Sequence, residues 1–442
     1  MQLTSGPKGH WLHNTQCFSP DDRWIVYDLR RDDAMIASTG AIEKVHVETG
    51  ETVELYRTTG QTAHGPGVGA ATYSPRAHRV LFIHGLRNCS AARPYDFRRR
   101  TGVAVDDARP GVPIFVDARD VTAPWTPGAL RGGTHAHTWS GDGRWISFTY
   151  QDAVLGDLER ATGTEGLDPR TVGVSAPIRP VRVDKDAEGE NHDGEMFSAV
   201  VARVVSHPRP GSDEIERAFS DSWVGTNGYL RGDGSRQARA LAFQGHVRDR
   251  AGRKISEVFL VDLPERIDVP GPDGPLEGTA TGRPMPPKGT VQRRLTYTAD
   301  RKHPGIQGPR HWLRSAPNGA SIAFLAKDDR GIVQIFLVSP QGGEPVQLTR
   351  NRWPVQTSFH WSSDGRFLAY GMDNSIFLTD VTPGATFGQS TRVTERFPDD
   401  SRPMGPVWSN DGRTIAYNRF VRVAGQAVPQ IFLLTWKKDK TP

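Results

Sequence analysis

The chain has 442 residues, 36% of them hydrophobic, with 47 glycines, 33 prolines and a formal net charge of +5. This apolar content suffices for a sizeable core, and the many glycines and prolines are typical of an all-β architecture rich in turns. The small charge excess does not favour nucleic-acid binding, and the two cysteines, Cys17 and Cys89, provide no disulfide framework. Because the sequence has neither a run of about 18 apolar residues nor a secretory signal, we expect no membrane span and a cytoplasmic protein.

One pattern recurs along the chain: the end of a strand, a tight turn rich in Ser, Pro, Asp and Gly, and a second strand. In the clearest copy, Gly141-Asp142-Gly143 supplies the turn conformations, and polar and apolar residues then alternate up to Tyr150. This alternation with a period of two residues indicates a strand. Six copies are recognisable, at residues 18–27, 73–83, 139–150, 315–324, 361–370 and 408–417.

The stretch between Tyr150 and Ser315 is too long for one unit. Candidate strands at 197–205, 238–243 and 257–262 predict a seventh unit whose first hairpin is opened by an insertion, residues 206–237. Within this insertion, residues 213–222 have the composition of a short helix. Residues 264–290 are rich in Pro and Gly, and we expect a mobile loop between the third and fourth strands of the same unit.

Each unit also carries a third strand and a fourth strand that ends in an apolar residue followed by Thr. Examples are Val121-Thr122, Leu295-Thr296, Leu348-Thr349 and Val393-Thr394. Four short strands in each unit of about 45 residues or more predict a seven-bladed β-propeller of the all-β class. Residues 1–4 resemble the fourth strand at 346–349, so we expect an N-terminal strand (residues 1–5) to complete the last blade and close the ring, with an open solenoid as the alternative.

We expect one domain over residues 1–442, with two insertions at 206–237 and 264–290. The expected blades span roughly residues 12–57, 68–123, 134–190, 192–297, 310–350, 356–395 and 404–437.

Most of the 14 histidines fall near one mouth of the predicted channel. His135 and His137 stand two residues apart on one strand and should share a face, which makes them a candidate pair for Zn²⁺, Mn²⁺, Fe²⁺ or Ni²⁺. Since three or four ligands are usual, His311 and His360 are the candidate further ligands across the channel. His13 and Gln356 are possible additional ligands. The alternative is that each histidine bonds a backbone carbonyl near the axis.

A second candidate feature begins at His84, which ends a strand and precedes an arginine-rich loop. His84 is a candidate general base, because imidazole titrates near neutrality. Arg93, Arg98 and Arg99 are candidates to hold a carboxylate or phosphate, and Arg87 and Arg100 lie in the same stretch. The alternatives are a strand-end histidine bonded to the backbone and a solvated basic loop.

The repeat written as Ser19-Pro20-Asp21-Asp22-Arg23-Trp24, with its Asp-Gly-Arg copies, resembles the TolB-type propeller repeat. The whole chain resembles a TolB-like bacterial propeller family of unknown function. The residues that carry this resemblance are His135-Ala136-His137, Pro309-Arg310-His311-Trp312, 331–334 and 339–345.

A more distant resemblance is to oligogalacturonate lyases. It rests on Thr134-His135-Ala136-His137 and Phe82-Ile83-His84, although the first of these stretches stands in a different blade context. The resemblance implies a cytoplasmic seven-bladed propeller with a divalent metal, most often Mn²⁺, held by several His and a Gln at the channel mouth. It also implies a histidine base at the position of His84.

Two functional hypotheses follow. The first is a metal-dependent enzyme that acts by β-elimination on an acidic oligosaccharide or sugar acid, with a metal and arginines that neutralise the substrate carboxylate. The second is a non-catalytic TolB-like propeller that binds a protein or peptide. Neither hypothesis involves nucleic acid or a membrane.

Overall fold

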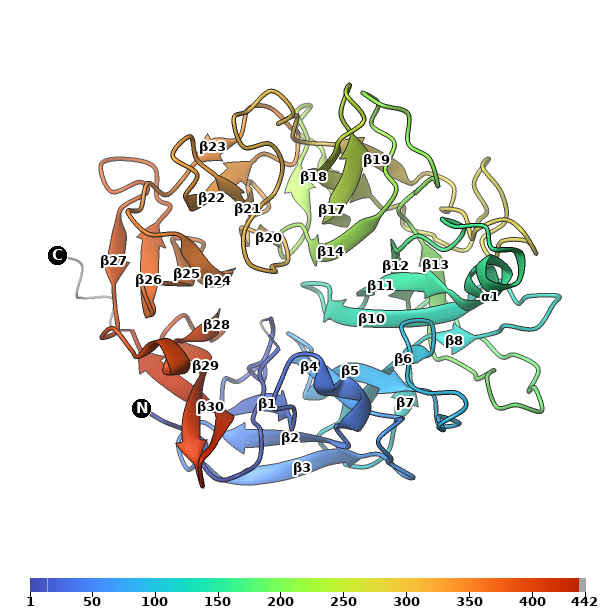
Figure 1. Ribbon diagram of the computed structural model, residues 1–442, viewed down its shortest axis with the longest axis horizontal. Coiled ribbons are helices and arrows are strands. Elements are labelled where there is room, and N and C mark those ends of the chain that lie inside the picture. Colours follow the sequence, from blue (N-terminus) through green and yellow to red (C-terminus); the bar gives the residue numbers. More distant parts are fainter. Residues whose placement is uncertain (14, 437–442) are drawn as a thin grey trace.

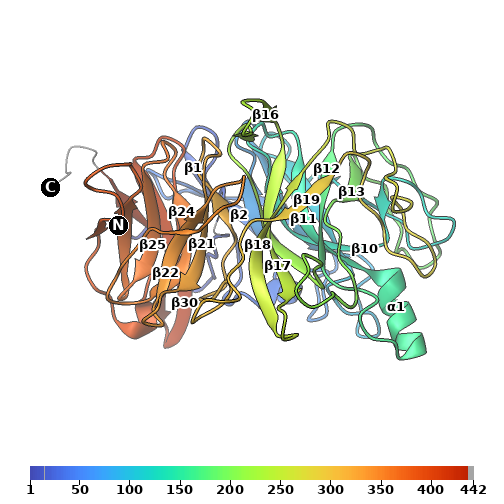
Figure 2. The ribbon, with the colours of Figure 1, turned by 90° about the horizontal axis from the view of Figure 1, so that it is seen from above.

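The computed structural model describes residues 1–13 and 15–436, and their strands form seven antiparallel sheets that stand around a central axis like the blades of a propeller (Figure 1). The fold class predicted from the repeats is therefore confirmed. Within each blade the strands run outward from the axis in chain order. Figure 2 shows the ring from the side, with α1 projecting from one face.

The first three blades contain three or four strands each. Blade 1 has β1 (Trp24–Asp28), β2 (Ala41–His46) and β3 (Thr52–Arg57), and bridges from Trp11 to Asp28 and from Phe18 to Ile25 place Trp11 and Phe18 on its inner side. Blade 2 has β4 (Val68–Tyr73), β5 (Arg79–Gly85), β6 (Arg100–Asp106) and β7 (Ile114–Phe115). Blade 3 has β10 (Gly132–Trp139), β11 (Ile146–Asp152), β12 (Thr171–Ala176) and β13 (Phe197–Val200).

The remaining blades follow the same order. Blade 4 has β14 (Ala218–Trp223), β17 (Ala240–Arg248), β18 (Lys254–Asp262) and β19 (Val291–Arg294). Blade 5 has β20 (Arg314–Ser315), β21 (Ile322–Lys327), β22 (Val333–Val338) and β23 (Val346–Gln347). Blade 6 has β24 (Val355–Trp361), β25 (Phe367–Met372), β26 (Ser375–Asp380) and β27 (Ser390–Arg392). Blade 7 has β28 (Met404–Trp408), β29 (Thr414–Val423) and β30 (Gln426–Thr435).

Short elements lie in the loops between the strands of the blades. The pair β8 (Ala118–Arg119) and β9 (Ala129–Leu130) is parallel, and β15 (Tyr229–Leu230) pairs with β16 (Arg236–Gln237) in a small hairpin. Helix α1 (Ala153–Thr162) begins at Asp152, whose side chain accepts a hydrogen bond from the Leu155 N–H, and ends at Gly163 in the left-handed conformation. Two 3₁₀ turns are η1 (Met35–Ser38) and η2 (Asp399–Ser401). In the described residues no helix is long and apolar enough to cross a membrane.

The N-terminal residues complete blade 7, as predicted. Gln2 pairs with Phe432 of β30, the Leu3 N–H donates to the Ile431 carbonyl over 2.8 Å, and the Leu433 N–H donates to the Met1 carbonyl over 2.8 Å. Residues from the start of the chain thus supply the outermost strand of the last sheet, which closes the ring and pairs that sheet edge.

The Thr residues that mark the fourth strands have a common structural role. The Thr4 hydroxyl accepts the Ile431 N–H over 2.8 Å, and the hydroxyls of Thr296, Thr349 and Thr394 accept the N–H groups of Val258, Ile335 and Ile376 in the same way. Each bond satisfies a third-strand N–H that the short fourth strand leaves unpaired. Val121-Thr122 is an exception, because the fourth strand of blade 2 is β7 and Thr122 lies in the loop beyond it.

The boundary between blades 3 and 4 differs from the prediction. β13 pairs with β12 and is the outer strand of blade 3, so residues 197–200 do not begin blade 4. Residues 218–223, expected within a helix, instead form β14, the inner strand of blade 4. The segment that opens the first hairpin of this blade is therefore 224–239, not 206–237. The excursion at 264–290 does lie between β18 and β19, as expected.

The hydrophobic core lies between neighbouring blades. The largest cluster joins blades 3 and 4 through Phe197, Phe243 and Phe259, and another joins blades 1 and 2 through Val26 and Phe82. Because apolar side chains occupy these interfaces, the polar residues of the inner strands face the axis, and this is where the candidate site lies.

Candidate functional site

A cavity of about 830 Å³ opens at one mouth of the channel. Its walls come from the inner strands β4, β10 and β14, from the loop between β1 and β2, and from the segment before β20. Its volume lies within the range of about 300–1,000 Å³ that is typical of small-molecule sites.

Five arginines line this cavity, and three of them stand at the start of a strand or directly before one. Arg100 is the first residue of β6, Arg170 precedes β12, and Arg217 precedes β14. Among the described residues, none of the three forms an ion pair with a carboxylate, although Asp96 lies close enough to influence the Arg100 charge. In the described residues the cavity therefore holds three cations without an ion-pair partner, although the carboxylates of Asp32, Asp33 and Asp96 also line it.

Aromatic rings hold these guanidinium groups in place. Arg100 lies over Tyr95 and Phe97, 4.8 and 4.6 Å from their ring centroids, and Arg170 lies 5.4 Å from the centroid of the same Phe97. Arg217 lies 5.2 Å from the Phe219 centroid. Stacking on an aromatic face orients a guanidinium. In Arg170, the Nε and Nη2 groups also donate to the Gln151 side-chain oxygen over 3.1 and 2.7 Å.

The lowered pKa values of the three arginines show that their charged forms are unfavourable in this cavity. Burial, followed by the charges of Arg217 and Arg100, lowers the pKa of Arg170 to about 9. Burial also lowers the pKa values of Arg100 and Arg217. Because the cations destabilise one another, a bound anion would be favoured strongly.

Two histidines face the same cavity. His13 packs edge-on against Trp312, with ring centroids 5.3 Å apart, and its Nε2 has no hydrogen-bond partner. His135 likewise has an Nδ1 without a partner. Burial, followed by nearby arginine charges, lowers the pKa of both imidazoles well below 6.5, so both are neutral at neutral pH.

His137 does not share a face with His135, contrary to the prediction. The pairing of β10 with β11 shifts between His135 and Thr138, and Ala136 adopts the left-handed conformation with φ of +56°. This β-bulge changes the face of the sheet to which the following side chains point. His137 instead bonds the Thr134 hydroxyl over 2.9 Å, and that hydroxyl donates to Asp117.

The other candidate metal ligands are also apart. His311 donates from Nδ1 to the Pro309 carbonyl and accepts the Leu325 N–H at Nε2, so both of its nitrogens are occupied. His360 lines a different cavity at the opposite mouth, and the Gln356 side-chain oxygen accepts the Asn374 N–H. No group of three metal-binding side chains occurs in residues 1–13 and 15–436, so the expected four-histidine set is not brought together.

The predicted base and anion-binding arginines lie outside the cavity. His84 is buried, with Nδ1 bonded to the Gly85 carbonyl and Nε2 accepting the Tyr56 hydroxyl over 2.9 Å. Arg93 pairs with Glu188 on the surface, and Arg99 pairs with Glu190 over 2.8 Å. His84 thus matches the alternative of a strand-end histidine bonded to the backbone, and Arg100 is the member of the stretch that reaches the cavity.

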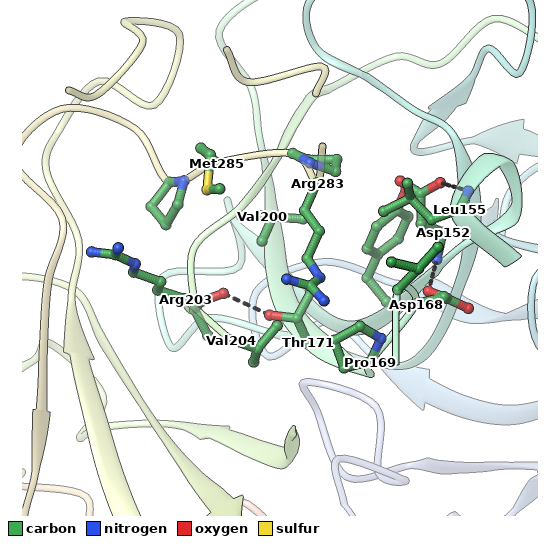
Figure 3. Close-up of a pocket in the computed structure, with 15 residues that line it drawn as sticks. Asp152, Leu155, Asp168, Pro169, Thr171, Val200, Arg203, Val204, Arg283 and Met285 are labelled. Carbon is green, nitrogen blue, oxygen red and sulfur yellow. Dashed lines mark hydrogen bonds between the residues drawn. The ribbon is translucent and has the colours of Figure 1, made fainter. Parts of the chain in front are cut away.

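Arg98 pairs with Asp168, which lines a second, smaller cavity beside α1 (Figure 3). The Arg98 Nε donates to Asp168 over 2.6 Å, and Asp168 also accepts the Asp152 N–H over 2.6 Å. Arg283 and Met285, from the 264–290 excursion, close this cavity over Val200 (Figure 3). These charged groups are already paired, so they hold the excursion and α1 against blade 3.

Sequence reasoning missed Arg170 and Arg217. An arginine directly before an inner or third strand is the signal that they share with Arg100. The signal at Arg217 was hidden because residues 213–222 were expected to be helical and not a strand.

Fold and site together define a seven-bladed β-propeller with an arginine-lined cavity at one mouth. The family described as "Protein of unknown function (DUF3748)" matches residues 67–191. The Escherichia coli protein described as "Uncharacterized protein YidR" is 41% identical over 421 residues, which cover 94% of each chain. The chain belongs to the family of this YidR protein.

Solved structures resemble the fold more distantly. An oligogalacturonate lyase from Vibrio parahaemolyticus aligns with a TM-score of 0.55 and 11% identity, over 100% of this chain and 94% of that one. TolB from Acinetobacter baumannii aligns with a TM-score of 0.37 and 14% identity, over 97% and 82% of the two chains. The first likeness supports the fold, and the second is too weak to carry an argument.

Proposed function

We propose that the cavity binds the carboxylates of an acidic oligosaccharide and that the protein is a lyase acting on it by β-elimination. The observation that carries the proposal is the set of three guanidiniums, Arg100, Arg170 and Arg217, around one cavity without a carboxylate partner among the described residues. Guanidinium pairs with carboxylate in a bidentate geometry, and the half-exposed Phe97 ring offers an apolar surface for a sugar ring.

The same groups suit the chemistry of elimination. Arginines that neutralise a uronate carboxylate stabilise the negative charge that develops when the adjacent C5–H loses its proton. The neutral imidazole of His135 or His13 accepts this proton, the C–H electron pair forms the C4=C5 double bond, and the C4–O glycosidic bond breaks. The leaving oxygen takes up a proton. The fold likeness to oligogalacturonate lyase agrees with this substrate class.

The divalent metal expected from the family resemblance has no matching ligand set in the described residues, and the proposed steps use only the side chains of the cavity. The alternative of a binding module for a protein or peptide predicts that acidic sugars bind no better than neutral sugars of equal length.

The test compares Arg100→Gln with Arg93→Gln as a matched control that removes an exposed, paired arginine. We measure the binding of oligogalacturonates by calorimetry and the formation of the unsaturated product by its ultraviolet absorbance. Loss of one charged hydrogen-bond donor should weaken binding roughly 10- to 100-fold in Arg100→Gln, with little change in the control.

Equal effects of the two substitutions, or no binding of any acidic sugar by the unaltered protein, would contradict the proposed function. Binding without product would retain the acidic-sugar site and rule out the lyase activity.

A further inference from the structure

A single ion pair crosses the mouth of the channel. Asp33 lies in the loop between β1 and β2 of blade 1, and Arg310 lies before β20 of blade 5, on the opposite side of the ring (Figure 1). The Arg310 Nη1 donates to the Asp33 carboxylate over 2.7 Å. Both side chains are more than half exposed, at 61% and 52%.

This pair stands between two chambers. The main cavity and a neighbouring one of about 240 Å³ are both lined by Asp33, Arg310, His13 and Trp312, so these residues form the wall that the two chambers share. The three cations of the proposed carboxylate site all line the larger chamber. Any ligand that extends from one chamber into the other must pass this wall.

The smaller chamber has features of a second subsite. Trp11 and Trp312 line it, and the Arg310 guanidinium lies 4.8 Å from the Trp312 ring centroid. Arg402 also lines it and has no ion pair within the described part of the chain. The smaller chamber thus places the Trp11 ring and two further cations, Arg310 and Arg402, beside the three cations of the proposed carboxylate site in the larger chamber.

The Asp33 side of the bridge is anchored independently of Arg310. Asp33 accepts a hydrogen bond from Arg30 over 3.1 Å, and Arg30 is itself held by Asp28 through two bonds of 2.7 and 2.9 Å. Asp33 therefore keeps one cationic partner when Arg310 turns away. An exposed ion pair is weak, so it opens at little cost.

We propose that Arg310 holds the second carboxylate of an acidic oligosaccharide, and that Asp33 occupies Arg310 until this carboxylate displaces it. This inference rests on the proposed acidic-sugar site. It adds that the Asp33–Arg310 pair determines which length of oligosaccharide is bound best. A monouronide binds within the larger chamber and leaves the pair intact, whereas an oligomer that reaches into the smaller chamber exchanges the Asp33 carboxylate for its own.

The test measures the affinities of galacturonate and trigalacturonate for Asp33→Asn and for its matched control, Asp32→Asn. Asp32 lines the same cavity and carries the same charge, but no ion pair of Asp32 is present in the described residues. Asp33→Asn should strengthen trigalacturonate binding about two- to fivefold and leave galacturonate within twofold, because only the longer ligand competes with Asp33.

Arg310→Gln should weaken trigalacturonate binding at least about fivefold and leave galacturonate unchanged. In the double variant Asp33→Asn/Arg310→Gln, the gain from Asp33→Asn should disappear, because the two residues act on each other. Both positions are exposed, and thermal unfolding verifies that each variant is folded.

If Asp33→Asn changes the ratio of the two affinities no more than Asp32→Asn does, the length determinant is wrong while the acidic-sugar site stands. If the unaltered protein binds neither sugar, both the site and the inference fail.

Discussion

At the scale of single residues, the cavity is built from side chains that work against stability in the free protein. Arg100, Arg170 and Arg217 line the same partly buried cavity. Burial, followed by the positive charges of Arg217 and Arg100, lowers the pKa of Arg170 to about 9. Functional sites commonly hold such unfavourable groups because a ligand relieves them.

Arg217 allows a direct test of whether these cations favour ligand binding at the expense of stability. Replacing Arg217 with Gln removes a partly buried cation that has no carboxylate partner in the described residues. We expect the free energy of unfolding to rise by about 0.5–1 kcal/mol while the affinity for an acidic sugar falls. Urea denaturation and calorimetry on the same preparation check both effects. A loss of stability would instead show that Arg217 serves mainly to pack on Phe219.

At the scale of elements, β-bulges at the channel mouth decide which side chains reach the cavity. The inner strands β4, β10 and β14 each shift register, with the left-handed residues Ala70, Ala136 and Ser220 at the shift. All three line the main cavity. The bulge in β10 directs the His135 and His137 side chains to different faces. Both the strands and the bulges within them therefore determine the shape of the site.

The left-handed conformation at position 136 leads to a prediction. A β-branched side chain is strained at positive φ, so Ala136→Val should lower the free energy of unfolding by about 2 kcal/mol, whereas Ala136→Gly should leave it nearly unchanged. Guanidinium denaturation of the two variants provides the comparison. If valine were tolerated as well as glycine, the bulge would not be a fixed feature of β10.

At the scale of the whole molecule, the blades bury many imidazoles. Burial is the main cause that lowers the histidine pKa below 6.5, to about 3 or 4 or further, at His10, His13, His84, His135, His137, His192, His246, His311 and His360. The unfolded chain therefore binds more protons than the folded one once the pH falls below 6.5. Asp117, Asp168 and Asp221 act in the opposite direction, because burial raises the pKa of Asp168 to about 7 and that of each of the other two to about 6.

Because the histidines outnumber these three carboxyl groups, stability should be complete above about pH 6.5 and fall as the pH approaches 4. Between about pH 7.5 and about pH 5.5 we expect a loss of several kcal/mol, measured as a shift in the urea midpoint at constant ionic strength. A midpoint that stays constant or rises on acidification would show that these imidazoles bind protons in the folded state.

The repeated turns and the Thr-ended fourth strands allowed the sequence by itself to determine the seven-bladed fold and the closure of the ring. These are local signals: Ser140 bonds Asp142 within its own turn, and Thr349 bonds the neighbouring third strand. The N-terminal strand could be assigned because Leu3-Thr4 repeats the pattern of Leu348-Thr349.

Only the tertiary structure decided which chemical groups meet at the mouth. Period-two reasoning placed His135 beside His137, but a one-residue bulge at Ala136 reverses the alternation that the reasoning assumes. Arg100, Arg170 and Arg217 lie far apart in the sequence and carry no shared local motif beyond preceding a strand. Blade order brings them together around the axis, since the ring turns distant residues at equivalent strand ends into neighbours.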